Sequence, residues 1–132
     1  MIYDNLIKGQ DCEYLVKEAL EDLGYKVNIE DTFYDLKAIK NNKEILIEVK
    51  SANFRVRNGS NNFRYGRFDF TDKKNRVLQR KNNVYVCFVM RLKEELVILG
   101  LIKAKIIKAK RYVNLIDVLT KRKLRKLESL EK

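Results

Sequence analysis

Two alternating stretches, residues 33–40 and 43–50, are joined by Asn41-Asn42 and constrain the fold more than any other feature of the sequence. Alternation of apolar and polar residues has the period of a half-buried β-strand. Asparagine tolerates the positive φ that a two-residue hairpin turn requires. If the asparagines form the turn, Lys40 lies opposite Lys43, and the numbers of every directly opposed pair sum to 83. The sequence therefore predicts a β-hairpin whose register is set by its turn.

In this register the two faces of the hairpin differ in chemistry. Asp35 lies across from Glu48, with Cβ atoms ~5 Å apart, and Lys50 points to the same face because side chains alternate along a strand. Opposed carboxylates repel each other. This repulsion is reduced if one of them takes up a proton, if a cation lies nearby or if both bind a metal ion. A slip by one residue would expose the apolar set, so the pattern fixes the register. The residues expected on the apolar face are Tyr34, Leu36, Ala38, Ile45, Ile47 and Val49.

The rest of the chain predicts helices and strands around this hairpin. An apolar stripe predicts a helix over residues 10–23, ended by Gly24 in a left-handed cap. Residues 51–70 are expected to be irregular or weakly stranded. Strands are expected at 25–29, at 84–90 and at 95–102 (extension through Ile106 left open), and helices at 71–81 and 114–130. This order predicts an α/β architecture, a mixed sheet flanked by helices, in a single domain spanning residues 1–132.

Residue types that are absent exclude several kinds of chemistry. The chain has no histidine, which excludes zinc–histidine sites and Ser-His-Asp triads and leaves oxygen ligands for any metal. Cys12 and Cys87 are far apart in sequence and lie among apolar neighbours, so we expect buried free thiols. No apolar run is long enough to suggest a membrane span or membrane partner. No secretory signal pattern is present either, and a cytoplasmic protein is expected.

The net charge of +11 is concentrated in two segments. Residues 51–82 carry nine Lys or Arg against two Asp or Glu, and residues 103–126 carry ten against one. For the earlier segment a polyanion partner is the favoured explanation, because so many close cations repel one another unless they are neutralised. For the later one a solvated surface explains the charge equally well. Phe68 and Phe70 are expected in the core. The expected nucleic-acid contacts are Arg55, Arg57, Arg64, Arg67, Lys73 and Lys74.

The stretch YDLKAIKNNKEILIEVKSA resembles the signature of the PD-(D/E)xK nuclease superfamily. That signature is an acidic residue, a hairpin turn and a hydrophobic strand ending in (D/E)-x-K, matched here by Asp35 and by Glu48-Val49-Lys50; its usual proline is Tyr34 in this chain. Residues 9–52 are also similar to the archaeal Holliday-junction resolvases and related restriction-type endonucleases. The resemblance implies a restriction-endonuclease-like fold with an α-β-β-β-α-β core.

The resemblance also implies roles for these residues. Asp35 and Glu48, aided by the Val49 carbonyl, would hold Mg²⁺, with Mn²⁺ able to substitute. Lys50 would position or deprotonate a water or neutralise developing charge. Glu13 would complete the site or be an ordinary helix residue, and Ser51 is a weaker candidate of the same kind.

The function expected from this resemblance is a Mg²⁺-dependent endonuclease that hydrolyses DNA phosphodiester bonds, with branched or structured DNA a candidate substrate. Cutting of two strands would favour a homodimer. The first alternative is a non-catalytic nucleic-acid-binding module on the nuclease fold. The second is a basic structural or assembly protein, which explains the charge but not the acidic pair that faces Lys50.

Overall fold

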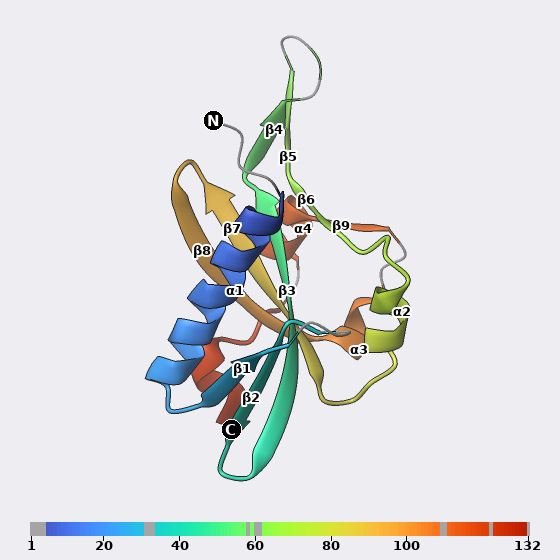
Figure 1. Cartoon of the computed structure of the whole chain (residues 1–132). Helices are drawn as coiled ribbons and strands as arrows, with labels where there is room; N and C mark the ends of the chain where they lie inside the picture. The colour runs from blue at the N-terminus through green and yellow to red at the C-terminus, as the bar shows by residue number, and fades with distance from the viewer. Residues whose placement is uncertain are drawn as a thin grey trace.

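A five-stranded mixed sheet forms the centre of the molecule (Figure 1). The structure, a computed structural model, describes residues 5–30, 34–57, 59, 62–108, 111–121 and 123–131. The strands of the sheet, in spatial order, are β1 (Lys26–Ile29), β2 (Leu36–Lys40), β3 (Lys43–Asn53), β7 (Val84–Leu92) and β8 (Glu95–Lys103). Neighbouring strands are antiparallel except for β3 and β7, which are parallel. The α/β fold class predicted from the sequence is confirmed.

The β2–β3 hairpin has the register that the sequence predicts. Asn41 and Asn42 have φ values of 53° and 64°, and the pairs run from Lys40 opposite Lys43 to Leu36 opposite Ile47. The first strand is shorter than expected, because β2 begins at Leu36 and Asp35 lies in the bend before it. The expected start near Phe33 lies outside the described residues.

Two apolar cores cover the two faces of the sheet. The helix α1 (Asn5–Asp22) packs on one face, where its Val16 and Leu20 meet Leu36 and Ile47. The other face is covered by Phe68 and a group of short elements. These are β6 (Arg67–Asp69), α2 (Lys74–Leu78), α3 (Ala104–Ile107), β9 (Tyr112–Asn114) and α4 (Leu115–Thr120). Because side chains alternate along β3, Leu46, Glu48 and Lys50 belong to this second face.

One residue of the hairpin was assigned to the wrong face. Tyr34 was expected on the same apolar face as Leu36 and Ala38, but it packs against the second core, which contains Phe68. It precedes the bend at Asp35 and is not part of β2, so the alternation of the strand does not extend to it. The other five residues of the apolar face lie in or against the core under α1.

The segment after β3 forms short strands. β3 itself runs to Asn53, three residues beyond the expected end. Then β4 (Arg55–Arg57) pairs with β5 (Phe63–Tyr65) in a separate two-stranded hairpin, and β6 pairs with β9. Figure 1 shows the β4–β5 hairpin projecting away from the sheet. The prediction of weak strands within residues 51–70 is therefore confirmed, but β3 is longer than predicted.

The C-terminal prediction was wrong. In place of one helix over residues 114–130, the chain forms β9, α4 and a 3₁₀ helix, η1 (Leu127–Glu131). Between the helices the backbone of Arg125 pairs with Leu101 of β8, through two N–H to O bonds of 2.8 Å. Strand pairing at the edge of the sheet therefore interrupts the helix. The extension of β8 through Ile106, which the sequence left open, does not occur, because α3 begins at Ala104.

The remaining elements agree with the sequence in type and differ at their ends. The first helix begins earlier than expected and α2 is shorter, and Gly24 has the predicted left-handed conformation, with a φ of 98°. Cys12 and Cys87 are buried free thiols, as predicted, and burial raises the pKa of Cys87 to about 12. Within the described part of the chain, no helix has the length and apolar character needed to cross a membrane.

Candidate functional site

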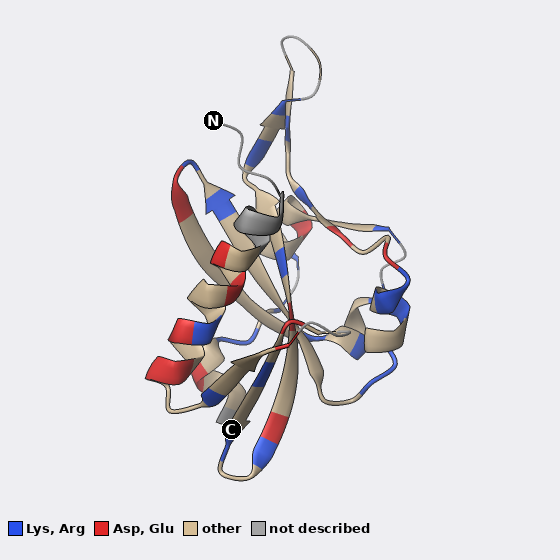
Figure 2. Cartoon of the chain, in the orientation of Figure 1, with Lys and Arg blue, Asp and Glu red and all other residues tan. Residues whose placement is uncertain are grey.

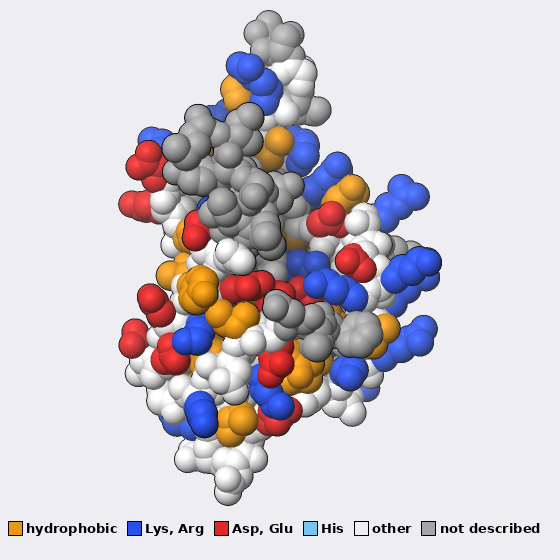
Figure 3. All heavy atoms as spheres, in the orientation of Figure 1, with side chains coloured by type: hydrophobic (Ala, Val, Ile, Leu, Met, Phe, Trp, Pro, Cys, Tyr) orange, Lys and Arg blue, Asp and Glu red, His pale blue; other side chains and the backbone are white. Residues whose placement is uncertain are grey.

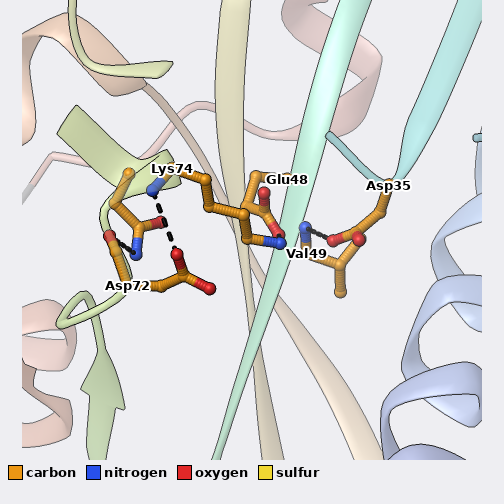
Figure 4. A network of polar contacts seen from close by, with 6 residues as sticks. Asp35, Glu48, Val49, Asp72 and Lys74 are labelled. Atoms are coloured by element: carbon orange, nitrogen blue, oxygen red, sulfur yellow. Dashed lines mark hydrogen bonds and ion pairs between the residues drawn. The ribbon is translucent and has the colours of Figure 1, made fainter. Parts of the chain in front are cut away.

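Asp35 forms hydrogen bonds with the two residues of β3 that flank Glu48. Its backbone N–H donates to the carbonyl of Ile47 at 3.0 Å, and its Oδ2 accepts a hydrogen bond from the N–H of Val49 at 2.7 Å. Figure 4 shows Asp35 approaching β3 from the side of β2. The bend before β2 thus fixes the aspartate beside the glutamate, as the register of the hairpin requires.

Glu48 is a buried carboxylate whose two oxygens differ in their contacts with the described residues. Only 3% of the residue is exposed, and Oε1 accepts a hydrogen bond from Lys74 Nζ at 3.3 Å. Oε2 is buried and has no hydrogen-bond partner among the described residues. Burial, followed by the neighbouring Asp35 carboxylate, raises the pKa of Glu48 to about 8, although the positive charges of Lys50 and Lys74 oppose the shift. A buried acceptor without a donor is costly, so this oxygen is suited to a cation or a proton.

Lys50 is close to both acids on the same face of the sheet. Its side chain is half-buried, and Nζ lies 5.0 Å from the centre of the Phe70 ring. Burial and the positive charge of Lys74 lower the pKa of Lys50, while Glu48, Asp35 and Asp69 act in the opposite direction. The predicted grouping of Asp35, Glu48 and Lys50 is therefore present in the structure.

A second lysine in the site was not foreseen as part of it. Lys74 begins α2, and its backbone N–H donates to Asp72 Oδ1 at 3.0 Å. From there its side chain reaches Glu48 (Figure 4). Burial disfavours its charge, but Glu48 and Asp35 more than compensate, so the pKa of Lys74 is raised. The sequence suggested only a DNA contact for this residue. Nothing in the local sequence shows that this side chain meets Glu48, which lies 26 residues earlier in the chain.

Comparison with known proteins now identifies the family. The sequence profile of the PD-(D/E)XK nuclease superfamily domain matches residues 4–125. The chain belongs to the PD-(D/E)XK nuclease superfamily. Among solved structures, it resembles the bacterial homing endonuclease I-Ssp6803I, with a TM-score of 0.58 and 13% sequence identity over 96% of this chain and 85% of that one. At this identity the likeness shows the shared fold. A search of curated proteins found no match.

Members of the PD-(D/E)XK superfamily generally use divalent metals, and the residues of this site fit one. Hard cations take oxygen ligands, and Asp35 and Glu48 supply two carboxylates, of which that of Glu48 has a buried oxygen with no hydrogen-bond partner in the described part of the chain. Among the described residues, no cluster of three or more acidic, cysteine or histidine side chains forms a ready-made metal centre. The role expected for the Val49 carbonyl, as a further oxygen ligand from the backbone, stays a prediction.

The two weaker candidates lie on other parts of the fold. Glu13 is half-buried on α1, which packs against the opposite face of the sheet from Glu48. Its participation in the site stays a prediction. Ser51 follows Lys50 and so points to the α1 face, where it is close enough to Cys12 to form a hydrogen bond. The structure does not bring Ser51 together with Lys50.

The expected nucleic-acid contacts come from short elements that follow β3 in the chain. Arg55 and Arg57 belong to β4, Arg64 to β5 and Arg67 to β6, while Lys73 immediately precedes α2. Figure 2 shows basic residues on β4 and around α2 and acidic ones along α1, and Figure 3 shows basic side chains gathered over the β4–β5 hairpin and α2. Phe68 and Phe70 are 0% and 2% exposed, so their predicted place in the core is confirmed.

Proposed function

We propose that the protein is a Mg²⁺-dependent endonuclease that hydrolyses DNA, with Asp35, Glu48 and Lys50 at its reacting centre. The observation that carries the proposal is the buried Oε2 of Glu48 beside Asp35, which no hydrogen-bond donor among the described residues reaches. Membership of a nuclease superfamily supports the reaction class. The basic surface around α2 and the β4–β5 hairpin supports a polyanionic substrate.

Asp35, Glu48 and the Val49 carbonyl would hold the metal. When bound, Mg²⁺ would supply an activated water and stabilise negative charge on the phosphate. Lys74 holds Glu48 Oε1 and so leaves Oε2 free to act as a ligand. The fixed N–H of Val49 orients Asp35.

Lys50 is the residue suited to act on the attacking water or the scissile phosphate. Its position above Phe70 keeps the ammonium group half-buried, where electrostatic interactions are stronger than in bulk water. Because its pKa is lowered, Lys50 can release a proton more readily than an exposed lysine. It is therefore a candidate general base as well as a donor to the developing charge.

Branched or structured DNA is the substrate that we propose to test first, and a two-fold dimer is the arrangement that would cut both strands. Linear duplex, nicked and four-way-junction DNA are incubated with Mg²⁺ or Mn²⁺ and with wild-type protein, Asp35→Asn or Lys50→Ala. Matched controls are Glu44→Gln and Lys37→Ala, an exposed acid and a half-exposed lysine of the same hairpin that pair with each other at 3.7 Å.

We expect cleavage by the wild type and by both controls, and at least a hundredfold loss in Asp35→Asn and Lys50→Ala with DNA binding retained. Binding without cleavage in every metal would overturn the proposal in favour of a non-catalytic binding module. No affinity for DNA at moderate salt would leave only a basic structural protein.

A further inference from the structure

The β4–β5 hairpin presents an unusual surface for an isolated pair of strands. Arg55 pairs with Tyr65 and Arg57 with Phe63. Directly opposed residues share a face, and residues two apart on one strand share it too. All four therefore lie on one face, and all four are exposed, Phe63 to 55% and Tyr65 to 49%. The other face carries the half-buried residues Val56 and Arg64.

Three of these four side chains make ring contacts, one of them with Phe54 at the base of the hairpin. The guanidinium carbon of Arg55 lies 4.9 Å from the centre of the Phe63 ring, and Tyr65 meets Phe54 edge-on with ring centres 5.3 Å apart. Such contacts reduce the number of orientations available to the arginine and the rings. The face is therefore partly organised in the absence of a partner.

The base of the hairpin is fixed to the sheet. The Phe54 N–H donates to the carbonyl of Arg91 at 2.8 Å, and the Gly66 carbonyl accepts from the N–H of Leu115 at 3.0 Å. Gly66 also touches the backbone so closely that an added Cβ would lie 1.9 Å from the carbonyl oxygen of Asn53. Only glycine allows this approach. Both strands of the hairpin thus leave the body from hydrogen-bonded positions, in the direction shown in Figure 1.

We infer that the face formed by Arg55, Arg57, Phe63 and Tyr65 enters the major groove of duplex DNA and reads base edges. The inference rests on the proposed function and adds a source of sequence preference to it. The major groove admits a two-stranded β-ribbon. Arginine recognises the edge of guanine through two hydrogen bonds, and apolar groups contact the methyl group of thymine.

Two other partners fit this face less well. A contact with phosphates alone would use the arginines and leave two half-exposed aromatic rings without a role. A second copy of the chain would bring the arginines of each face against those of the other, because a two-fold interface is self-complementary. With a chain of net charge +11, charge complementarity favours a polyanion.

The distance between the hairpin and the site limits which base pairs are read. From Glu48 to Arg57 there are nine residues, which span at most about 30 Å at roughly 3.3 Å per residue. Base pairs rise by about 3.4 Å each. The preferred bases should therefore lie within about nine base pairs of the cleaved phosphate.

Binding-site selection from a random duplex library tests this inference. The wild type, Arg57→Ala and Arg57→Lys are each incubated with the library in Ca²⁺, so that binding is read without cleavage, and the bound DNA is sequenced. Arg57→Lys keeps the charge but lacks the forked geometry that guanine recognition needs. Lys126→Ala, an exposed cation far along the chain in the C-terminal segment, is the control.

We expect the wild type and Lys126→Ala to select the same short motif. Both Arg57 variants should lose about 5- to 150-fold of the preference at one position of it. Arg57→Lys should nevertheless bind random DNA about as tightly as the wild type. An unchanged motif in both variants, or no motif in any protein, would overturn the inference. So would a shift from dimer to monomer caused by Phe63→Ser, which would assign the face to self-association.

Cleavage of plasmid DNA is measured in parallel, so that the two proposals fail separately. A wild type that cuts but shows no base preference would contradict only the role of the hairpin. A wild type that selects a motif but never cuts would contradict the nuclease proposal.

Discussion

Glu48→Gln should stabilise the metal-free protein at high pH while it abolishes metal binding. The pKa of the Glu48 carboxyl rises from 4.5 to about 8, first because of burial and then because of Asp35. Below pH 4.5 this group is protonated in both the folded and the unfolded chain. Between pH 4.5 and 8 the folded protein keeps a proton that the unfolded chain has lost, so the free energy of unfolding declines as pH rises. Above pH 8 the free energy of unfolding is lowered by the full cost of burying the charged Glu48 carboxylate.

The size of the effect follows from the two pKa values. A tenfold change in proton affinity corresponds to about 1.4 kcal/mol, so the buried charge costs the fold at most about 5 kcal/mol at pH 9. Glutamine has nearly the same shape and carries no charge. The variant loses the ion pair with Lys74, whose side chain is 31% exposed, and this loss offsets part of the gain. The expected net stabilisation at pH 9 is about 2 to 4 kcal/mol.

Urea unfolding in EDTA, followed by circular dichroism at pH 4.5, 7 and 9, measures this difference. The gap between Glu48→Gln and the wild type should be near zero at pH 4.5 and should widen as the pH rises. Mg²⁺ should then stabilise the wild type and leave the variant unchanged, because a ligand stabilises only a state that binds it. The exposed Glu44→Gln serves as a control and should change stability by less than about 0.5 kcal/mol. A variant that is less stable than the wild type at pH 9, or a gap independent of pH, would refute the reasoning.

Three further predictions concern other parts of the structure. Lys74→Ala removes a charge that lowers the pKa of Glu48, so the pH at which Mn²⁺ binding is half-maximal should be higher than in the wild type or in the exposed control Lys81→Ala. Calorimetric titrations at a series of pH values measure this pH, and an unchanged value would contradict the effect of Lys74 on Glu48. Gly66→Ala should lower the free energy of unfolding by at least about 2 kcal/mol, because its Cβ collides with the Asn53 carbonyl; urea titration checks it, and full stability would show that the close approach is not needed. Asn42→Gly should raise the unfolding free energy by a few tenths of a kcal/mol to about 1 kcal/mol, since glycine adopts φ near 64° more readily; a loss of stability in the same assay would contradict the turn geometry.

The sequence was informative where local rules decide the structure. The asparagine turn and the alternation of β2 and β3 are encoded within a few residues, and they set the register that places Asp35 beside Glu48. The prediction for Tyr34 was wrong because side-chain alternation holds only within a strand, and Tyr34 precedes the bend before β2.

Long-range packing decided the features that the sequence did not reveal. Lys74 joins the site through its ion pair with Glu48, which lies 26 residues earlier in the chain, and no pattern near residue 74 shows this. The C-terminal segment has a helical pattern, yet the backbone of Arg125 forms hydrogen bonds with Leu101 of β8 instead of bonds within a helix. The sequence indicated weak strands over residues 51–70 but not the pairing of β4 with β5, because three-residue strands are too short to show a period.

The most direct test of the central claim is the stoichiometry of Mn²⁺ binding, read by electron paramagnetic resonance at pH 8.5. If Asp35 and Glu48 converge on one ion, the wild type should bind one Mn²⁺ per chain. Asp35→Asn and Glu48→Gln should each bind none at the same concentration, while Lys50→Ala, which removes no ligand, should keep the ion. Retention of Mn²⁺ by both carboxylate variants would contradict the account, because the metal would then lie elsewhere in the protein.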